Sequence, residues 1–183
     1  LRPYIDWTPF FLSWELAGKF PRILEDEVVG EEATRLYADA NALVDRLGKD
    51  RRVRCAGVSG PVRATAVADS IEVYTDESRT QVRKVLHHLR QQSEKQGFPN
   101  YCLADYVAPK ESGKPDWIGA FAVTGGIGEE AIAKAYKADH DDYNAILIQA
   151  VCDRLAEAFA EYLHEQVRKV HCGYAPDEAL SNE

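Results

Sequence analysis

The sequence predicts an α+β fold. Apolar residues recur at helical spacing near both ends of the 183-residue chain, whereas two-residue alternation marks its middle. Helices and strands that occupy separate parts of a chain are typical of the α+β class. The length is sufficient for one compact domain with a hydrophobic core. We therefore expect residues 1–183 to form a single domain.

Two helices are predicted in the first fifty residues. Thr8 is a suitable N-cap, and Pro9 follows it at a position where a missing N–H costs nothing. Gly18 is expected to end this helix. The second helix is expected to follow Gly30 and to end at Gly48. Its apolar stripe consists of Ala33, Leu36, Tyr37, Ala40, Val44 and Leu47.

The middle of the chain has the pattern of strands. Residues 53–74 alternate with a period of two and predict strands. Residues 81–92 fit either a helix or a strand, and residues 100–107 fit a further strand, followed by a loop rich in Pro and Gly. Residues 117–123 are apolar on both faces, which predicts a buried central strand.

The clearest element is a long helix from about Asp141 to Val170. Asp141 and Asp142 provide a cap and negative charge at its start, and Arg168 and Lys169 provide positive charge at its end. Helical spacing is kept by an apolar series of Tyr143, Ile146, Leu147, Ala150, Val151, Leu155, Ala158, Phe159, Tyr162, Leu163, Val167 and Val170.

Composition narrows the function classes. A net charge of -8 argues against a nucleic-acid partner, which requires a basic face. No apolar run approaches the ~20 residues of a membrane-spanning helix, so no membrane partner is expected. The four cysteines form no CxxC pair, which favours free thiols in a reducing cytoplasm over disulfides or zinc.

Two short motifs invite a ligand but favour a structural interpretation. Residues 126–131 match G-x-G-x-x-A, yet Glu129 and Glu130 would repel a pyrophosphate at the helix start, so a glycine-rich turn is favoured over a nucleotide-dependent oxidoreductase. Residues 139–142 lack the ligand pattern of a calcium loop and favour helix capping. No metal site and no nucleophilic catalytic arrangement is expected.

The remaining candidate site residues carry carboxylates. Asp153, Glu157 and Glu161 are each four residues apart on one flank of the long helix. Like charges at this spacing repel by a few tenths of a kcal/mol. The row is therefore either a solvated face or a surface that receives a cationic ligand. Asp6 beside Trp7 either supports a helix start or presents an acceptor beside an aromatic ring.

Several segments together resemble the C-terminal activation domain of cobalamin-dependent methionine synthase. The similarity covers nearly the whole chain, with its segments in the same order. The matching runs are Asp6-Trp7-Thr8-Pro9-Phe10-Phe11, Pro21-Arg22-Ile23-Leu24, Leu89-Arg90-Gln91-Gln92, residues 102–110, residues 119–126, His140-Asp141-Asp142-Tyr143-Asn144, residues 153–161 and Gly173-Tyr174-Ala175-Pro176.

The resemblance implies a cytoplasmic domain bent around a mostly antiparallel sheet and flanked by helices. It implies a part of a methyltransferase that binds S-adenosylmethionine and closes over the cobalamin-binding domain of the same enzyme. With a flavodoxin-type electron donor, reductive methylation then converts cob(II)alamin to methylcobalamin. By resemblance, Asp6 and Glu157 contact S-adenosylmethionine, and Asp153 and Glu157 face the cobalamin.

The sequence departs from the family in two places. Residues 58–66 lack the expected Phe/Trp-Pro-Ala-Asn type of run. The family's Arg-x-x-x-Gly-Tyr motif, which grips the ligand, is expected downstream of Glu183, so the domain is expected to be C-terminally incomplete and inactive by itself. The alternative function is a docking module for the cobalamin domain and the reductase, without ligand affinity of its own.

Overall fold

The computed structural model describes residues 1–180, which form two compact units. The first unit, here called the helical unit, combines Leu1–Val58 with the chain from Ala122 onward. The second, the hairpin unit, is Ser59–Phe121. Helices and an antiparallel sheet occupy separate parts of the chain, which confirms the α+β class. That residues 1–183 make up one domain stays a prediction.

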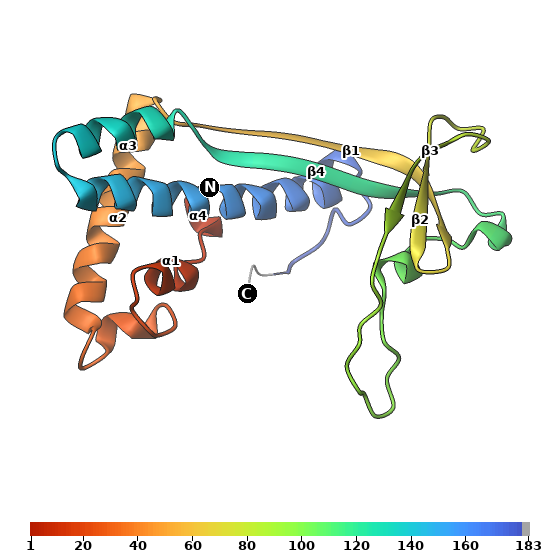
Figure 1. Cartoon of the computed structure of the whole chain (residues 1–183), viewed down its shortest axis with the longest axis horizontal. Helices are drawn as coiled ribbons and strands as arrows, with labels where there is room; N and C mark the ends of the chain where they lie inside the picture. The colour runs from red at the N-terminus through yellow and green to blue at the C-terminus, as the bar shows by residue number, and fades with distance from the viewer. Residues whose placement is uncertain (181–183) are drawn as a thin grey trace. The chain divides into compact units, whose positions relative to one another are not determined.

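The helical unit is assembled around one long helix, α4. In Figure 1, α2 (orange) and α3 (teal) lie near the end of α4 where that helix begins. The elements η1 and α1 also contact α4. The bounds are η1 Arg2–Tyr4, α1 Thr8–Ser13, η2 Arg22–Glu25, α2 Gly30–Asp50, α3 Glu129–Ala138, α4 Asp142–Gln166 and the π-helical turn η5 Val167–His171.

Apolar stripes of these helices meet in the larger core. The predicted stripe of α2 is buried at Ala33, Leu36, Ala40 and Leu47, and α4 contributes its own stripe, so the periodicity was a correct guide to the core face. Aromatic rings from the first unit's N-terminal segment fill the space beside α2. The largest fully buried side chains of this core are Phe10, Phe11, Leu36, Leu147, Ile148 and Val151.

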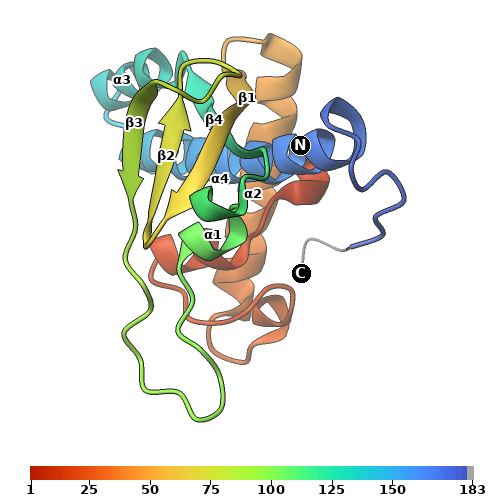
Figure 2. The same ribbon diagram turned by 90° about the vertical axis from the view of Figure 1, so that its right-hand side faces the viewer.

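The sheet has four strands in the order β3-β2-β1-β4. Their bounds are β1 Arg54–Val67, β2 Ser70–Tyr74, β3 Val82–His87 and β4 Asp116–Ile127. In the hairpin unit, β1 pairs antiparallel with β2, and β2 pairs antiparallel with β3, as Figure 2 shows. The ambiguous residues 81–92 therefore contain a strand, because Ile71 and Leu86 are paired across the sheet.

The hairpin unit has a small core of its own. Its buried members are Ala64, Ala66, Ile71, Cys102, Ala104 and Val107. A polar network lies beside them: the Tyr74 hydroxyl bridges the Thr65 hydroxyl at 2.7 Å and the Glu72 carboxylate at 2.8 Å. Six buried side chains of mostly small size make this the less extensive of the two cores.

Residues 100–107 do not form the predicted strand. They contain a 3-10 helix, η3, at Leu103–Tyr106, and a second one, η4, follows at Lys110–Ser112. The Asp105 carboxylate accepts the Cys102 N–H at 2.9 Å, which turns the chain locally. Such a bond competes with strand pairing, and this explains the error.

The prediction of a buried central strand at residues 117–123 is also wrong. These residues lie in β4, the last strand in the sheet order, and the side chains of Trp117 and Phe121 are 46% and 48% exposed. An apolar run in the sequence indicates the environment that a strand prefers. Its place in the sheet depends on pairing with residues distant in sequence, which the run does not contain.

The ends of the two N-terminal helices differ from prediction. The Thr8 hydroxyl does not cap α1 but accepts the Phe20 N–H at 3.2 Å, and α1 ends at Ser13, before Gly18. In α2 the helix continues past Gly48 to Asp50.

Candidate functional site

Asp6 occupies the turn between η1 and α1. Its Oδ1 accepts the Thr8 N–H at 2.9 Å, while the side chain remains exposed. Trp7 is buried, with its ring edge-to-face against Phe10 and Tyr37. Trp7 therefore does not present an exposed aromatic wall beside Asp6. The Asp6 carboxylate supports the start of α1 through Oδ1, and no hydrogen bond within residues 1–180 engages its Oδ2.

The segment that carries Asp6 is anchored to the second half of α4. The Tyr4 hydroxyl donates to Glu165 Oε2 at 2.6 Å, and the Tyr4 ring packs edge-on against Tyr162. This hydrogen bond raises the pKa of Tyr4. Glu165 lies about 12 Å further along α4 than Glu157. Both Asp6 and Glu157 are thus positioned by α4, although no hydrogen bond within residues 1–180 joins them.

The predicted carboxylate row lies on the exposed face of α4. Asp153, Glu157 and Glu161 are all exposed, and none forms an ion pair within residues 1–180. Mutual repulsion at four-residue spacing costs a few tenths of a kcal/mol per pair. The fold therefore keeps three uncompensated negative charges on one helix face, which is a favourable surface for cationic or hydrogen-bond-donating groups.

A polar hollow of about 480 Å³ brings Asp153 together with Glu129, a residue that sequence reasoning assigned only to a helix start. Glu129 begins α3, and its Oε1 is buried with no hydrogen-bond partner among residues 1–180. An unsatisfied buried acceptor costs about 1–3 kcal/mol, so this oxygen is suited to an external donor. The hollow is lined by Thr124, Gly125, Gly126, Glu129, Gln149, Cys152, Asp153 and Ala156.

Cys152 in this hollow is not a nucleophile. Burial, together with the negative charge of Glu129, raises the pKa of its thiol to about 12. The thiolate is the reactive form of cysteine, and it is scarce at neutral pH with such a pKa. Cys55, Cys102 and Cys172 are also free thiols. The chemistry of the hollow is therefore that of its carboxylates.

The glycine-rich turn before α3 serves chain packing. A Cβ on Gly125 would lie 2.3 Å from the Ala156 nitrogen, and one on Gly128 would lie 2.3 Å from the Arg52 carbonyl oxygen. Gly128 also has a φ of 101°, which disfavours side chains. Close backbone approach explains both glycines without a nucleotide and supports the structural interpretation of this motif.

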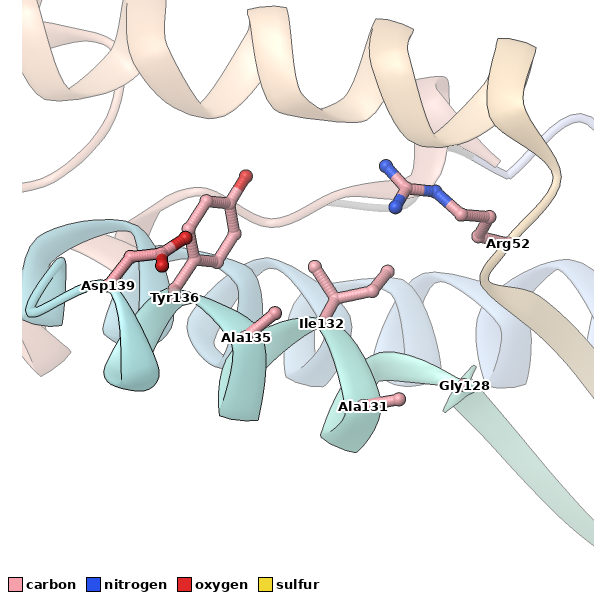
Figure 3. Close-up of a pocket in the computed structure, with 7 residues that line it drawn as sticks. All are labelled: Arg52, Gly128, Ala131, Ile132, Ala135, Tyr136 and Asp139. Atoms are coloured by element: carbon pink, nitrogen blue, oxygen red, sulfur yellow. The ribbon is translucent and has the colours of Figure 1, made fainter.

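A second hollow of about 560 Å³ lies along α3. Figure 3 shows the Arg52 guanidinium and the Tyr136 hydroxyl above a floor that includes Ile132 and Ala135. The Arg52 guanidinium donates to Asp50 at 3.1 Å, and both side chains of this ion pair are exposed. Charges so exposed contribute little to binding. None of the predicted site residues lines this hollow.

Within the described residues 1–180, no group of three or more His, Cys, Asp or Glu side chains is arranged to hold a metal ion. Over the same range, no helix is both long enough and apolar enough to cross a bilayer.

Comparison with known families decides the identity of the chain. The family described as "Vitamin B12 dependent methionine synthase, activation domain" matches residues 1–183. The chain belongs to this family. Among solved structures, this activation domain is similar to the "MetH Reactivation Domain bound to AdoHcy", with 65% sequence identity and a TM-score of 0.91. The match covers 99% of this chain and 56% of that one.

Proposed function

We propose that this activation domain binds S-adenosylmethionine as the methyl donor for reductive methylation of cob(II)alamin in B12-dependent methionine synthase. The observation that carries this proposal is the similarity to a reactivation domain whose structure contains AdoHcy. AdoHcy is what remains of S-adenosylmethionine once the methyl group has been given away. Family membership over residues 1–183 supports the same role.

The carboxylates near α4 fit such a ligand. S-adenosylmethionine carries an ammonium and a sulfonium, and ionised carboxylates bind ammonium donors through short, charge-assisted hydrogen bonds. Asp6 has its Oδ1 fixed by the Thr8 N–H, so that Oδ2 is held ready without further loss of side-chain entropy. We assign Asp6 and Glu157 to the ligand.

Asp153 and Glu157 are proposed to face the cobalamin side. Asp153 is exposed at the middle of α4, where its carboxylate is proposed to accept from a donor on the cobalamin-binding domain. Cobalamin held by the neighbouring domain would supply the chemistry of electron acceptance and methyl acceptance, with a flavodoxin-type protein as the electron donor. Because cobalamin and electron donor both come from outside residues 1–183, we expect no turnover by this chain alone. A cytoplasmic location stays a prediction.

Replacement of Asp6 by Asn tests the ligand assignment. In the intact domain of the parent enzyme, Asp6→Asn is expected to weaken S-adenosylmethionine binding about tenfold, because one charge-assisted hydrogen bond is lost. Isothermal titration calorimetry measures the dissociation constant, and Glu157→Gln is a second test of the same site.

Asp26→Asn is the matched control, because its Oδ1 also accepts a backbone N–H two residues later, from Val28 at 2.9 Å. This variant is expected to bind S-adenosylmethionine normally. An unchanged dissociation constant for Asp6→Asn would remove Asp6 from the site.

The alternative is a docking module without ligand affinity of its own. It is favoured by the observations that the chain spans 56% of the AdoHcy-bound relative and that neither hollow described above is lined by Asp6 or Glu157. Thermal-shift titration of residues 1–183 separates the two functions, since a ligand that binds only the folded state raises Tm. A shift with S-adenosylmethionine supports the ligand site, whereas binding of the cobalamin domain without that shift supports the docking module.

A further inference from the structure

The segment before α1 directs Asp6 away from the core. Its two neighbours, Ile5 and Trp7, are 8% and 5% exposed and pack in the larger core, whereas Asp6 between them is exposed. On the side of α1, the Asp6 Oδ1 accepts the Thr8 N–H, which ties the carboxylate to the start of that helix. On the other side, the backbone that carries Asp6 is held by different groups.

Tyr4 joins this backbone to α4. Its hydroxyl donates to Glu165 Oε2 at 2.6 Å, across 161 positions of the chain. The ring packs edge-on against Tyr162, with the ring centroids 5.5 Å apart. Because two residues of extended chain span at most about 7 Å, a displacement of Tyr4 reaches Asp6 almost undiminished. The Tyr4 contacts therefore help to set where the Asp6 carboxylate lies relative to α4.

The surroundings of Glu165 suit it as the acceptor of this bond. Lys169 donates to the Glu165 Oε1 at 3.1 Å, which leaves Oε2 for Tyr4. The hydrogen bonds from Tyr4 and Lys169 lower the pKa of Glu165, so its carboxylate is ionised at neutral pH. A hydrogen bond to an ionised acceptor is shorter and about twice as strong as one between neutral groups. The bond from Tyr4 is thus able to hold a short segment in one position.

The carboxylates on this flank of α4 differ in their surroundings. Glu157, Glu161 and Glu165 follow one another at four-residue spacing. Glu165 is bonded through both of its oxygens, whereas Glu157 and Glu161 are exposed and form no ion pair within residues 1–180. The flank thus combines an exposed carboxylate, Glu157, with one that anchors the segment of Asp6.

We propose that Tyr4 and Glu165 are positioning residues for S-adenosylmethionine binding. Their hydrogen bond holds residues 4–6 on α4 and so places the Asp6 carboxylate where a donor of the ligand meets it. Neither Tyr4 nor Glu165 contacts the ligand, and each acts through Asp6. This inference rests on the proposed function and on the assignment of Asp6 to the ligand. A carboxylate that is held in place before binding loses less entropy when the ligand arrives.

Calorimetric titration of the intact parent enzyme with S-adenosylmethionine tests the proposal. Tyr4→Phe removes the hydroxyl and keeps the ring. It is expected to raise the dissociation constant about fivefold, because the segment must then be ordered on binding. Glu165→Ala is expected to have the same effect. Glu165→Gln retains an oxygen that accepts the Tyr4 hydroxyl, so it should keep most of the affinity.

A double variant shows whether Tyr4 acts through Asp6. Asp6→Asn alone is expected to weaken binding about tenfold. If Tyr4 only positions Asp6, the addition of Tyr4→Phe to Asp6→Asn should leave the loss at about tenfold, whereas independent effects would multiply to about fiftyfold. The multiplied loss would overturn the proposal, and so would a Glu165→Gln variant that binds as weakly as Glu165→Ala.

Tyr143→Phe is the matched control. The Tyr143 hydroxyl also donates to a carboxylate, Asp39 Oδ2, at 2.6 Å, and this bond lies in the same unit at the start of α4. The variant loses a comparable hydrogen bond and should bind S-adenosylmethionine normally. Equal weakening by Tyr143→Phe and Tyr4→Phe would show a general effect of stability and contradict a positioning role.

The same titrations separate this inference from the proposed function. If Asp6→Asn weakens binding and Tyr4→Phe does not, the positioning role is wrong while the proposed function stands. If Asp6→Asn itself binds normally, both the assignment of Asp6 and the positioning role are wrong. If the unaltered enzyme does not bind S-adenosylmethionine, the proposed function itself fails.

Discussion

At the scale of single residues, surroundings decide what each carboxylate does. Asp105 is fully engaged, because Arg90 and the Cys102 N–H both bond to it. Glu129 is the opposite case, since its buried Oε1 has no partner within residues 1–180. Satisfied carboxylates of the first kind stabilise the fold, whereas an unsatisfied one is available for a ligand.

The pH dependence of stability follows from Asp105. The Arg90 guanidinium, with the Cys102 N–H, lowers the pKa of Asp105 from its usual range to about 2. A lowered pKa in the folded state stabilises the protein above the unfolded value of about 3.9, and this contribution is lost as the pH falls toward 2. Denaturant unfolding between pH 5 and 2 should therefore show stability that decreases with acidity, and Asp105→Asn should flatten this slope. Equal slopes for both proteins would contradict the assignment.

Gly125 is expected to be intolerant of any side chain. The Cβ of Gly125→Ala would meet the α4 backbone at Ala156 and Cys152, which cannot move as a side chain can. We expect a loss of about 3 kcal/mol in the free energy of unfolding. Gly119→Ala is the control in the same strand, because its Cβ meets nothing within 4 Å. Denaturant titration measures both, and a Gly125→Ala variant as stable as the control would refute the close approach.

At the scale of elements, the helix α4 contributes both to the hydrophobic core and to the candidate site. One face contributes Leu147, Ile148 and Val151 to the core, and the opposite face carries the uncompensated charges of Asp153 and Glu157. The helix is long enough to support η1, α1, α2 and α3 along its length. The candidate site therefore depends on the position at which α4 begins.

That position is set by Asp141. Its Oδ1 accepts the Asn144 N–H at 3.0 Å, as predicted for the N-cap, and this bond lowers the pKa of Asp141. Loss of the cap in Asp141→Ala should lower Tm by about 3 °C. Asp142→Ala, which removes first-turn charge but no cap, should cost less than half as much. Calorimetric melting curves compare them, and equal shifts would contradict the capping role.

At the scale of the whole molecule, two cores stabilise two units. The core cluster of the hairpin unit has six mostly small side chains, whereas that of the helical unit contains large aromatic and aliphatic ones. Stability in such a chain is not uniform, and the unit with the smaller core opens more readily.

Truncation of Ile71, the largest fully buried side chain of the hairpin unit, tests this separation. Ile71→Ala should destabilise the unit by about 3 kcal/mol through a cavity. Amide hydrogen exchange should accelerate in β2 and β3, while amides of α4 keep their protection. The control is Ile146→Ala, whose side chain is half exposed. Equal acceleration in α4 would show that the two cores unfold as one.

The sequence by itself determined the α+β class, the core face of α2, the capped start of α4 and the family. These features depend on residues within a few turns of one another or on matching segments in order, so the chain contains them directly. It also singled out Asp6, Asp153 and Glu157, whose roles stay predictions.

Only the tertiary structure decided that β4 lies at the end of the sheet order and that Glu129 shares a hollow with Asp153. It also decided that residues 100–107 contain a 3-10 helix and not a strand. Strand order and burial are set by contacts between residues far apart in the chain. Periodicity describes the preferred environment of a segment but not its neighbours. That Glu129 Oε1 has no hydrogen-bond partner among residues 1–180 is therefore visible only once α3 and α4 are packed together.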